Sequence, residues 1–200
     1  MNIYIDIETI PGTKPTKAKA PKTIKKAESI AAYEADPENI EKDWRKQSLQ
    51  TLNGEILCIG LAVNDGEVQI LSGEEGDLIE AFYLAMKDVK FPYSYVGHNI
   101  KGFDLPFLRH RLFKYGFKLP MPESRYSKMV EDTMDIWAGT DWQNRTSLDN
   151  IAKFLGLESS KGELDGSKVF DYWQDGREQE IYDYCKKDVE LTREIYKRIS

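Results

Sequence analysis

The sequence predicts an α/β fold in which a central mixed sheet of five strands is flanked by helices. Two observations support this class. Strand-like apolar runs alternate along the chain with segments of helical periodicity, which is the element order of α/β proteins. The chain of 200 residues is 40% hydrophobic and 12% aromatic, enough to bury a full core. We therefore expect one globular domain over residues 1–200, with a lysine-rich insertion at about 13–50.

Five segments are predicted to form strands. The first alternates apolar and polar residues, and the second, "EILCIGLAV", is a continuous apolar run typical of a central strand. Asn64-Asp65-Gly66 is a strong hairpin signal before the third, and the last two are "YSYVGHN" and "KMVEDTMDIW". The expected strands are residues 2–8, 55–63, 67–71, 93–99 and 128–137.

Four other segments have helical periodicity and suitable residues at their ends. Pro106 suits the first turn of one helix, and Gly116 would end it. Ser147 is a good N-cap for another helix, which Gly156 would stop. The expected helices are residues 74–89, 105–115, 148–156 and 178–199.

Residues 13–50 fit none of these patterns. Their first part, "TKPTKAKAPKTIKK", is dense in lysine, alanine and proline and is typical of a mobile loop. The second part, through Trp44, is compatible with a helix that caps the sheet. Two interpretations stay open: a basic flap that touches a phosphate backbone, or a solvated insertion whose lysines only keep the chain in solution.

Charge and cysteine content narrow the class of function. A net charge of -6 and a pI near 5.1 argue against coating nucleic acid through bulk positive charge, but not against an enzyme that holds a short stretch of it. Cys58 and Cys185 lack metal-ligand spacing and are expected to be reduced thiols. With no signal-like N-terminus and no apolar run near the ~20 residues that span a bilayer, we expect a soluble cytoplasmic protein without a membrane partner.

Two acids interrupt the first predicted strand. Asp6 and Glu8 are two residues apart, so both point to one side of the strand, opposite Ile5 and Ile7. Two close carboxylates repel unless a cation lies between them, and hard oxygen ligands suit Mg²⁺ or Mn²⁺. The alternative is a pair of strand-end acids bonded to a helix N-terminus or to an arginine.

Further acids occur where the chain could bring them to the same place. Asp104 follows a strand and opens a helix, a position that faces the cleft at the carboxyl ends of strands, although a simple N-cap is the alternative. Tyr184 and Asp188 lie one turn apart on the last helix. They could equally belong to an apolar stripe and a solvated edge. The conjunction of four acids and a tyrosine favours a functional site.

At these residues the sequence resembles the DEDD 3'-5' exonucleases of the ribonuclease-H-like superfamily. The motifs are "DIET", "HNIKGFD" and "YDYCKKD", and "SLDNIAKFLGL" and "DGREQEIYDYC" are also similar to that family. The greatest similarity is to predicted 3'-5' exonucleases related to the proofreading domain of family B DNA polymerases. The resemblance implies a ribonuclease-H-like three-layer fold whose central mixed five-stranded sheet is flanked by helices.

The resemblance also implies a role for each of these residues. Asp6 would bridge two divalent ions, Mg²⁺ or Mn²⁺, and Glu8 and Asp188 would complete the site that activates water. Asp104 would hold the second ion. Tyr184 would orient the attacking water, because an unperturbed phenol with a pKa of about 10 is a poor base at neutral pH.

The third motif also indicates the subgroup. Asp183 stands where one subgroup has a histidine, so Tyr184 points to the tyrosine subgroup, DEDDy. Thr9, through its backbone, and Asn99 and Phe103 beside the second motif are expected substrate contacts. A place in the core is the alternative for Phe103.

Two more acids, Asp132 and Asp135, lie near the fifth predicted strand, and either could lie near the metal ions. We do not assign them as metal ligands, because the family's four ligands are already accounted for.

The function implied is release of nucleoside 5'-monophosphates from the 3' end of single-stranded or frayed DNA by a two-metal mechanism. Two alternatives stay open: an exoribonuclease of the same fold and a non-catalytic nucleic-acid-binding module. The expected partners are a single-stranded DNA 3' end and separately encoded replication or repair proteins.

Overall fold

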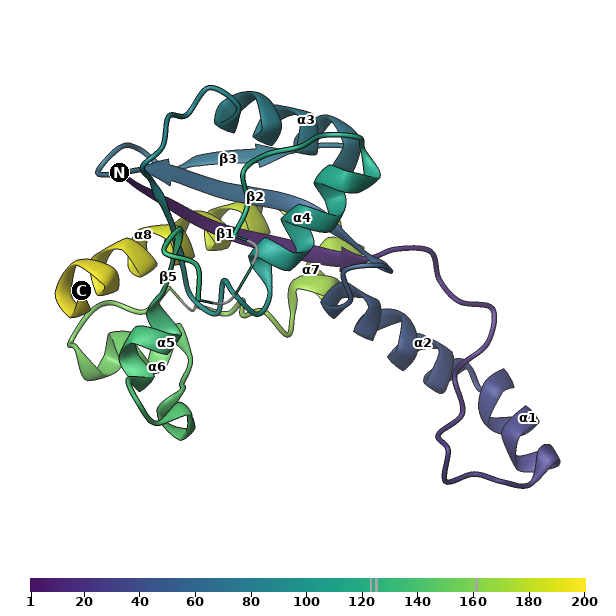
Figure 1. Ribbon diagram of the computed structural model, residues 1–200. Coiled ribbons are helices and arrows are strands. Elements are labelled where there is room, and N and C mark those ends of the chain that lie inside the picture. The colour runs from purple at the N-terminus through teal and green to yellow at the C-terminus, as the bar shows by residue number, and fades with distance from the viewer. Residues whose placement is uncertain (123, 125, 161) are drawn as a thin grey trace. The chain divides into compact units, whose positions relative to one another are not determined.

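The computed structural model describes residues 1–122, 124, 126–160 and 162–200. The chain divides into two compact units (Figure 1). Unit 1 comprises Met1–Glu8 and Ile56–Ser200, and unit 2 comprises Thr9–Glu55. Two strands, β1 (Asn2–Pro11) and β2 (Gly54–Val63), run through the boundaries of this division. The prediction of a single domain with an insertion at 13–50 stays a prediction.

Unit 1 contains the mixed five-stranded sheet that the sequence predicts. Its order is β3-β2-β1-β4-β5. β2 and β3 are antiparallel, whereas β4 is parallel to both β1 and β5. The backbone N–H of Asn64, after β2, donates to the carbonyl of Asn2 at the start of β1 (2.8 Å), so these two neighbours run in opposite directions. The remaining strands are β3 (Gln69–Ser72), β4 (Ser94–Gly97) and β5 (Val130–Asp132).

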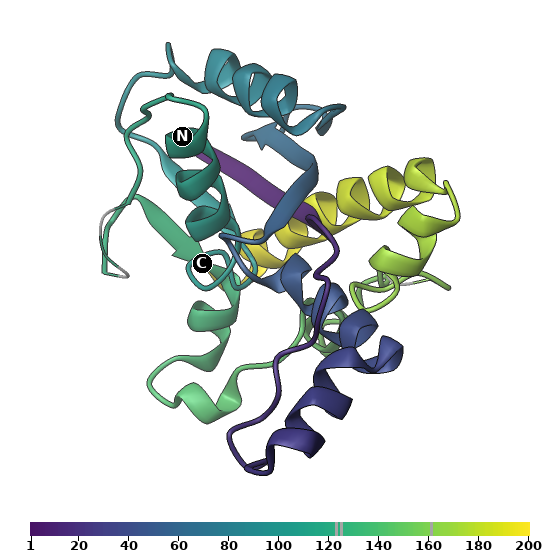
Figure 2. The same cartoon turned by 90° about the vertical axis from the view of Figure 1, so that its right-hand side faces the viewer.

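Helices lie on both faces of this sheet, so the three-layer prediction is confirmed. α3 and α4 cover one face, and α8 runs along the other (Figures 1 and 2). The helices of unit 1 are α3 (Glu75–Met86), α4 (Asp104–Lys114), α5 (Thr133–Ala138), α6 (Leu148–Phe154), α7 (Val169–Gln174) and α8 (Glu178–Ile199), with a 3₁₀ turn, η2 (Trp142–Asn144).

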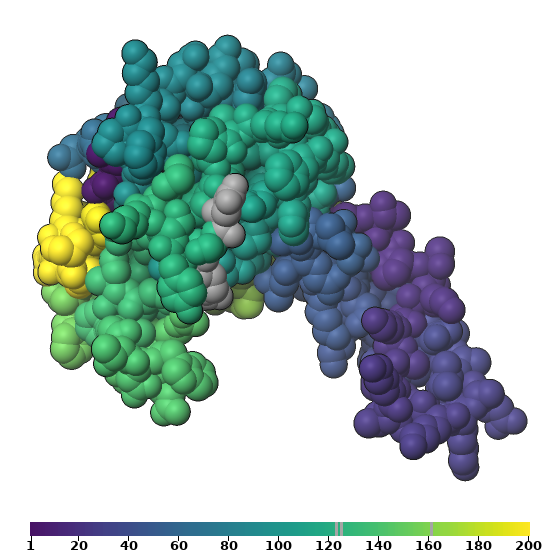
Figure 3. Space-filling model, viewed as in Figure 1, coloured from purple at the N-terminus to yellow at the C-terminus, as the bar shows by residue number. Residues whose placement is uncertain are grey.

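Alternate residues of β1 feed the cores on the two faces. Ile3, Ile5 and Ile7 are buried with residues of α3 and α4, whose outer surface is teal in Figure 3. Tyr4 points the other way and is buried in a cluster that includes Val189 of α8. The period of two along β1 therefore decides which side chains meet α8.

Unit 2 is built differently. It contains α1 (Ala27–Ala35), α2 (Pro37–Arg45) and a 3₁₀ turn, η1 (Lys46–Leu49), and none of these three helices has a buried residue. Residues 13–26, all of them described, contain neither helix nor strand. Hydrogen bonds hold the segment to its own unit: the N–H of Lys19 donates to Asp43 Oδ2 (2.8 Å), and Trp44 Nε1 donates to the carbonyl of Gly12 (2.7 Å).

The structure differs from the sequence-based predictions mainly after β4. The strand expected over 128–137 is wrong beyond Asp132, because the Asp132 carboxylate accepts from the N–H of Met134 and starts α5. α7 was not predicted, since six residues are too few to show periodicity. Ser147 does cap α6, as expected. Instead of one helix through Trp44, the chain forms two that Pro37 separates, and the idea that this segment caps the sheet stays a prediction.

No helix in the described part of the chain has the length and apolar character needed to cross a membrane.

Candidate active site

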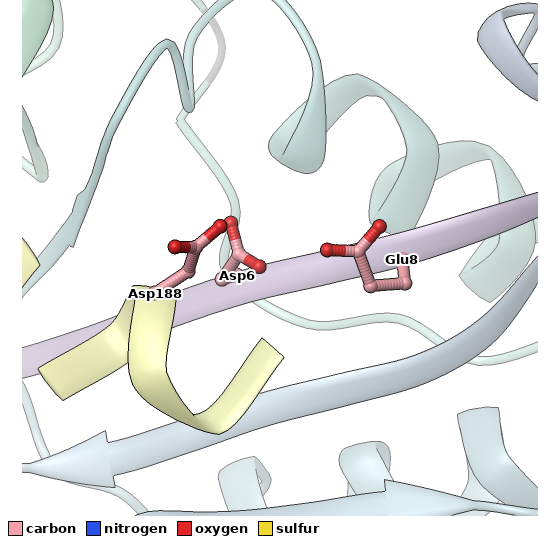
Figure 4. Close-up of side chains that lie close together, drawn as sticks. All are labelled: Asp6, Glu8 and Asp188. Carbon is pink, nitrogen blue, oxygen red and sulfur yellow. The ribbon is translucent and has the colours of Figure 1, made fainter. Parts of the chain in front are cut away.

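β1 presents Asp6 and Glu8 on the side of the sheet that faces α8. Ile5, which precedes Asp6, and Ile7, which lies between the two acids, are buried in the core on the other face of the sheet, with residues of α3 and α4. Figure 4 shows both carboxylates projecting from the same side of the strand. The alternation that makes β1 a buried strand is thus what brings the two acids together.

α8 brings the third acid to β1. Asp188 points toward Asp6 in Figure 4, and one carboxylate oxygen each of Asp6, Glu8 and Asp188 lies within 4.8 Å of the others. Gly60 of β2 permits this approach, since a Cβ there would stand 2.7 Å from Val189 Cγ2 and 3.0 Å from Cys185 Sγ. A residue without a side chain in β2 therefore lets α8 lie directly against the sheet.

The electrostatics of the cluster favour a bound cation. Burial raises the pKa of Asp6 well above its usual value, and the charges of Asp188 and Glu8 raise it further. Burial likewise raises the pKa of Glu8. Oδ2 of Asp6 is buried and has no hydrogen-bond partner among the residues that the structure describes. Grouped oxygen donors of this kind, one of them unsatisfied, fit a hard divalent ion such as Mg²⁺ or Mn²⁺.

Tyr184 lies one turn before Asp188 and is buried beside the cluster. Burial, followed by the charges of Asp188 and Glu8, raises the pKa of its hydroxyl far above the ordinary value, and a hydrogen bond with Asp188 adds to this. The hydroxyl therefore stays protonated at neutral pH and can donate a hydrogen bond.

Asp104 is the first residue of α4 and lies next to β1, but outside the group of three. Its Oδ1 accepts from the N–H of Ile7 (3.1 Å), and its side chain is buried. Burial raises its pKa to about 7, although backbone N–H groups that bond to it lower the value. Asp104 is thus held at the backbone between Asp6 and Glu8 without a position in the cluster itself.

Comparison with known proteins shows which family the chain belongs to. A family model described as "Predicted 3'-5' exonuclease related to the exonuclease domain of PolB" matches residues 56–200, most of the chain. The chain belongs to this family. Membership places it among nucleases, and so among hydrolases. The matched region contains Asp104, Tyr184 and Asp188, whereas Asp6 and Glu8 precede it.

Archaeal relatives support the family. A DNA polymerase of Archaeoglobus fulgidus is 25% identical over 156 residues, covering 72% of this chain and 20% of the polymerase. An uncharacterized protein of Methanocaldococcus jannaschii is 24% identical over 167 residues, covering 78% of this chain and 91% of that protein. The family B DNA polymerase structure from Pyrobaculum calidifontis matches with a TM-score of 0.66 and 18% identity, over 98% of this chain and 24% of the polymerase.

The relatives differ in how much of their length this chain covers. The chain spans only 20% and 24% of the lengths of the two polymerases, but 91% of the Methanocaldococcus protein. At 18% identity, the structural match shows the fold alone, and it agrees with the three-layer arrangement around the mixed sheet.

The three predicted substrate contacts lie in different surroundings in this PolB-related exonuclease chain. Thr9 is in unit 2, where its hydroxyl donates to the carbonyl of Ser48 (2.7 Å). Asn99 is exposed at the start of the loop that leads to Asp104. Phe103 packs partly buried against the core and Phe107, with ring centroids 5.1 Å apart, which favours the core alternative. Their roles toward substrate stay predictions.

The sequence analysis assigns no role to two polar side chains near the site of this family member, His98 and Asp132. His98 is bonded to Thr133 Oγ1 (3.0 Å) and to the Thr146 carbonyl (3.1 Å), and burial lowers its pKa to about 4, so it is neutral. Asp132 is buried, and its carboxylate accepts from the backbone N–H groups of Asn99 and Lys101. The only local signal for Asp132 was an acid followed by Thr and Met, a pattern that fits a helix cap as well as a strand.

The two cysteines, which are 127 positions apart, meet beside the acids. Both are free and buried, and a hydrogen bond with Cys58 raises the pKa of Cys185. Cys185 Sγ lies 3.6 Å from the carbonyl oxygen of Asp6. The thiols thus form part of the packing between β1, β2 and α8.

Proposed function

We propose that this chain is a metal-dependent 3'-5' exonuclease of the DEDDy type. It removes nucleoside 5'-monophosphates from the 3' end of single-stranded or frayed DNA by a two-metal mechanism. The observation that carries the proposal is the cluster of Asp6, Glu8 and Asp188, whose ligand atoms lie within 4.8 Å of one another in a chain of an exonuclease family.

The acids are assigned to the two ions according to their positions. Asp6, Glu8 and Asp188 would hold the first, and Asp104, bonded to the β1 backbone at Ile7, would contribute to the second. When bound, Mg²⁺ or Mn²⁺ makes a water nucleophilic near neutral pH and neutralises charge on the leaving oxygen.

The remaining chemistry belongs to side chains of α8. Because the raised pKa of Tyr184 keeps its hydroxyl protonated, Tyr184 donates a hydrogen bond and does not act as the base. The hydroxyl donates this hydrogen bond to Asp188, so its oxygen is left to accept from a water and orient it beside the cluster. Cys185, next in the chain, stays out of the reaction as a buried thiol.

The names of the relatives favour DNA over RNA as substrate, since one is a DNA polymerase and another structure is a family B DNA polymerase. Polymerase activity does not transfer, because the chain spans only 20% of the first. We infer that it works beside separately encoded replication or repair proteins. The free thiols Cys58 and Cys185 support a reducing compartment such as the cytoplasm.

The test uses two DNA oligonucleotides, one labelled at the 5' end and one at the 3' end, with Mg²⁺, Mn²⁺ or EDTA. We expect a ladder from the 5' label and immediate mononucleotide from the 3' label, each only with metal. The Asp188→Ala variant should show neither.

Cleavage of RNA but not of DNA in the same assay would identify RNA as the substrate and contradict the proposed DNA substrate. No cleavage of either, with retained binding to an oligonucleotide, would identify a binding module and contradict the proposal. Internal fragments without mononucleotide would show an endonuclease instead.

A further inference from the structure

One buried carboxylate fastens the loop that leads into Asp104. Asp132, at the end of β5, is 2% exposed. Its Oδ1 accepts from the N–H of Asn99 (2.9 Å) and of Met134 (3.0 Å), and its Oδ2 accepts from the N–H of Lys101 (3.1 Å). The carboxylate therefore joins the start of α5 to the loop of residues 98–103.

That loop turns sharply at Asn99. Asn99 has a φ of 56°, in the left-handed region, which asparagine adopts more readily than most other residues with a side chain. Its carbonyl accepts from the N–H groups of Gly102 (2.9 Å) and Phe103 (3.1 Å), which makes a tight turn immediately before Asp104. A change in the conformation of Asn99 would thus move the residue at which α4 begins.

Both carboxylate oxygens of Asp132 are needed for this role. A helix cap alone requires one acceptor, which serine or asparagine supplies equally well. Asparagine has a single acceptor oxygen, so its amide group would face one of the N–H donors that Asp132 now satisfies. The charge also has an electrostatic cost, since Asp132 is one of the groups that disfavour ionisation of Asp104.

We propose that Asp132 is a positioning residue, which holds the loop of residues 98–103 so that Asp104 stays at the β1 backbone where the second ion would bind. The role of Asp104 as a metal ligand rests on the proposed function. The hydrogen bonds by which Asp132 holds the loop do not depend on that function, and hydrogen exchange measures them directly.

Two variants separate the functions of Asp132. Asp132→Asn keeps the shape and removes one acceptor. Asp132→Ser keeps a good cap for α5 but is too short to reach the loop, so it guards against a simple failure to fold. Asp141→Asn is the matched control, because Asp141 is an exposed cap that accepts from the N–H of Gln143 (3.0 Å).

Hydrogen exchange and metal binding are measured on purified, metal-free full chain. We expect at least one of the amides of Asn99 and Lys101 in Asp132→Asn, and both in Asp132→Ser, to exchange ~5-fold faster, as expected for loss of a hydrogen bond of about 1 kcal/mol. Calorimetric titration should show Mn²⁺ affinity reduced ~10-fold or more, and kcat should fall while the KM for oligonucleotide changes little. Asp141→Asn should match the wild type in all three.

Faster exchange with unchanged Mn²⁺ affinity and kcat would overturn the proposal, because Asp132 would then serve the loop alone. Unchanged exchange in both variants would also overturn the proposal, because Asp132 would then not hold the loop of residues 98–103. If the wild type binds Mn²⁺ but cleaves nothing, the proposed function fails, while the exchange and binding data still decide the role of Asp132.

Discussion

Glu75 and Asp6 are both acids of unit 1 withdrawn from solvent, but their surroundings are opposite. The Glu75 carboxylate forms ion pairs with Arg111 (3.0 Å) and Lys114 (2.8 Å) and accepts from the N–H of Ile56 (2.9 Å). The charged side chains close to Asp6 are other acids, Asp188, Glu8 and Asp104. Its Oδ2 has no hydrogen-bond partner in the described chain.

The difference separates two uses of a buried charge. An acid surrounded by cations and N–H donors is satisfied by the fold, and it holds elements together, here β2, α3 and α4. An acid surrounded by acids destabilises the fold until a cation arrives. The surroundings of a carboxylate therefore say more about its role than its burial does.

The largest expected effect is that of Asp6→Asn, which removes one charge from the cluster at nearly constant shape. We expect cleavage in Mg²⁺ to fall on the order of 10³-fold. Metal-free Asp6→Asn should nevertheless unfold at a higher temperature than the wild type, because repulsion is relieved. An oligonucleotide assay and thermal unfolding in EDTA measure the two effects. Unfolding at a lower temperature would mean that Asp6 is held by interior donors, as Glu75 is.

Glu75→Gln should do the reverse. It leaves Arg111 buried without its counter-charge, so we expect the free energy of unfolding to fall by about 3 kcal/mol. Mn²⁺ affinity should stay at the wild-type value. Urea unfolding and calorimetry test these expectations, and a reduction of Mn²⁺ affinity comparable to that of Asp6→Asn would remove the distinction between the two acids.

The stability of the metal-free protein should also depend on pH through the buried acids of the site. The pKa of Asp104 is about 7 in the folded protein and about 3.9 in the unfolded chain. Ionised Asp104 therefore lowers the stability of the metal-free protein, and the full cost is present above pH 7. As pH falls from about 7 to 4, this cost disappears. His98 acts oppositely, because its pKa is lowered to about 4 and the unfolded chain takes up the proton first.

Asp104→Asn isolates the carboxyl from the effect of His98. In EDTA the variant should be more stable than the wild type at pH 7.5, by a few °C in Tm, and the difference should vanish toward pH 4. A difference that is independent of pH would show that the Asp104 carboxyl keeps an ordinary pKa.

The smallest expected effect concerns cations of unit 2. Lys14 and Lys17 pair with Glu41 and Glu34, at 3.1 and 3.2 Å. The ammonium groups of three exposed lysines have no hydrogen-bond or ion-pair partner among the described residues. These are Lys22, Lys25 and Lys26. Because an exposed ammonium group is satisfied by water, this arrangement fits both the flap and the solvated insertion.

On the flap interpretation, replacing these three lysines with alanine weakens binding of single-stranded DNA in EDTA. The slope of log affinity against log salt should decrease in magnitude by about 2, because each phosphate that a lysine neutralises contributes ~0.7 to it. Lys87, Lys90 and Lys118, exposed in unit 1, provide a control with the same change in charge. Equal slopes for the two triple variants would favour the solvated insertion.

Local periodicity explains what the sequence could predict. A period of two placed Asp6 and Glu8 on one side of β1, and a spacing of four placed Tyr184 and Asp188 on one side of α8. The residues that adjust the site could not be found this way. Asp132 acts through backbone groups of residues about 30 positions earlier, and the adjacency of Cys58 and Cys185 depends on the docking of α8.

The close approach at Gly60 has a consequence for how related sequences should be compared. A methyl group at this position would meet Val189 and Cys185, and α8 would have to retreat from the sheet with Asp188 on it. A homologue could then keep every acid of the three motifs and still lack a functional centre. Counting ligands alone would misclassify such a chain, whereas a glycine at position 60 indicates that the helix can still reach the strand.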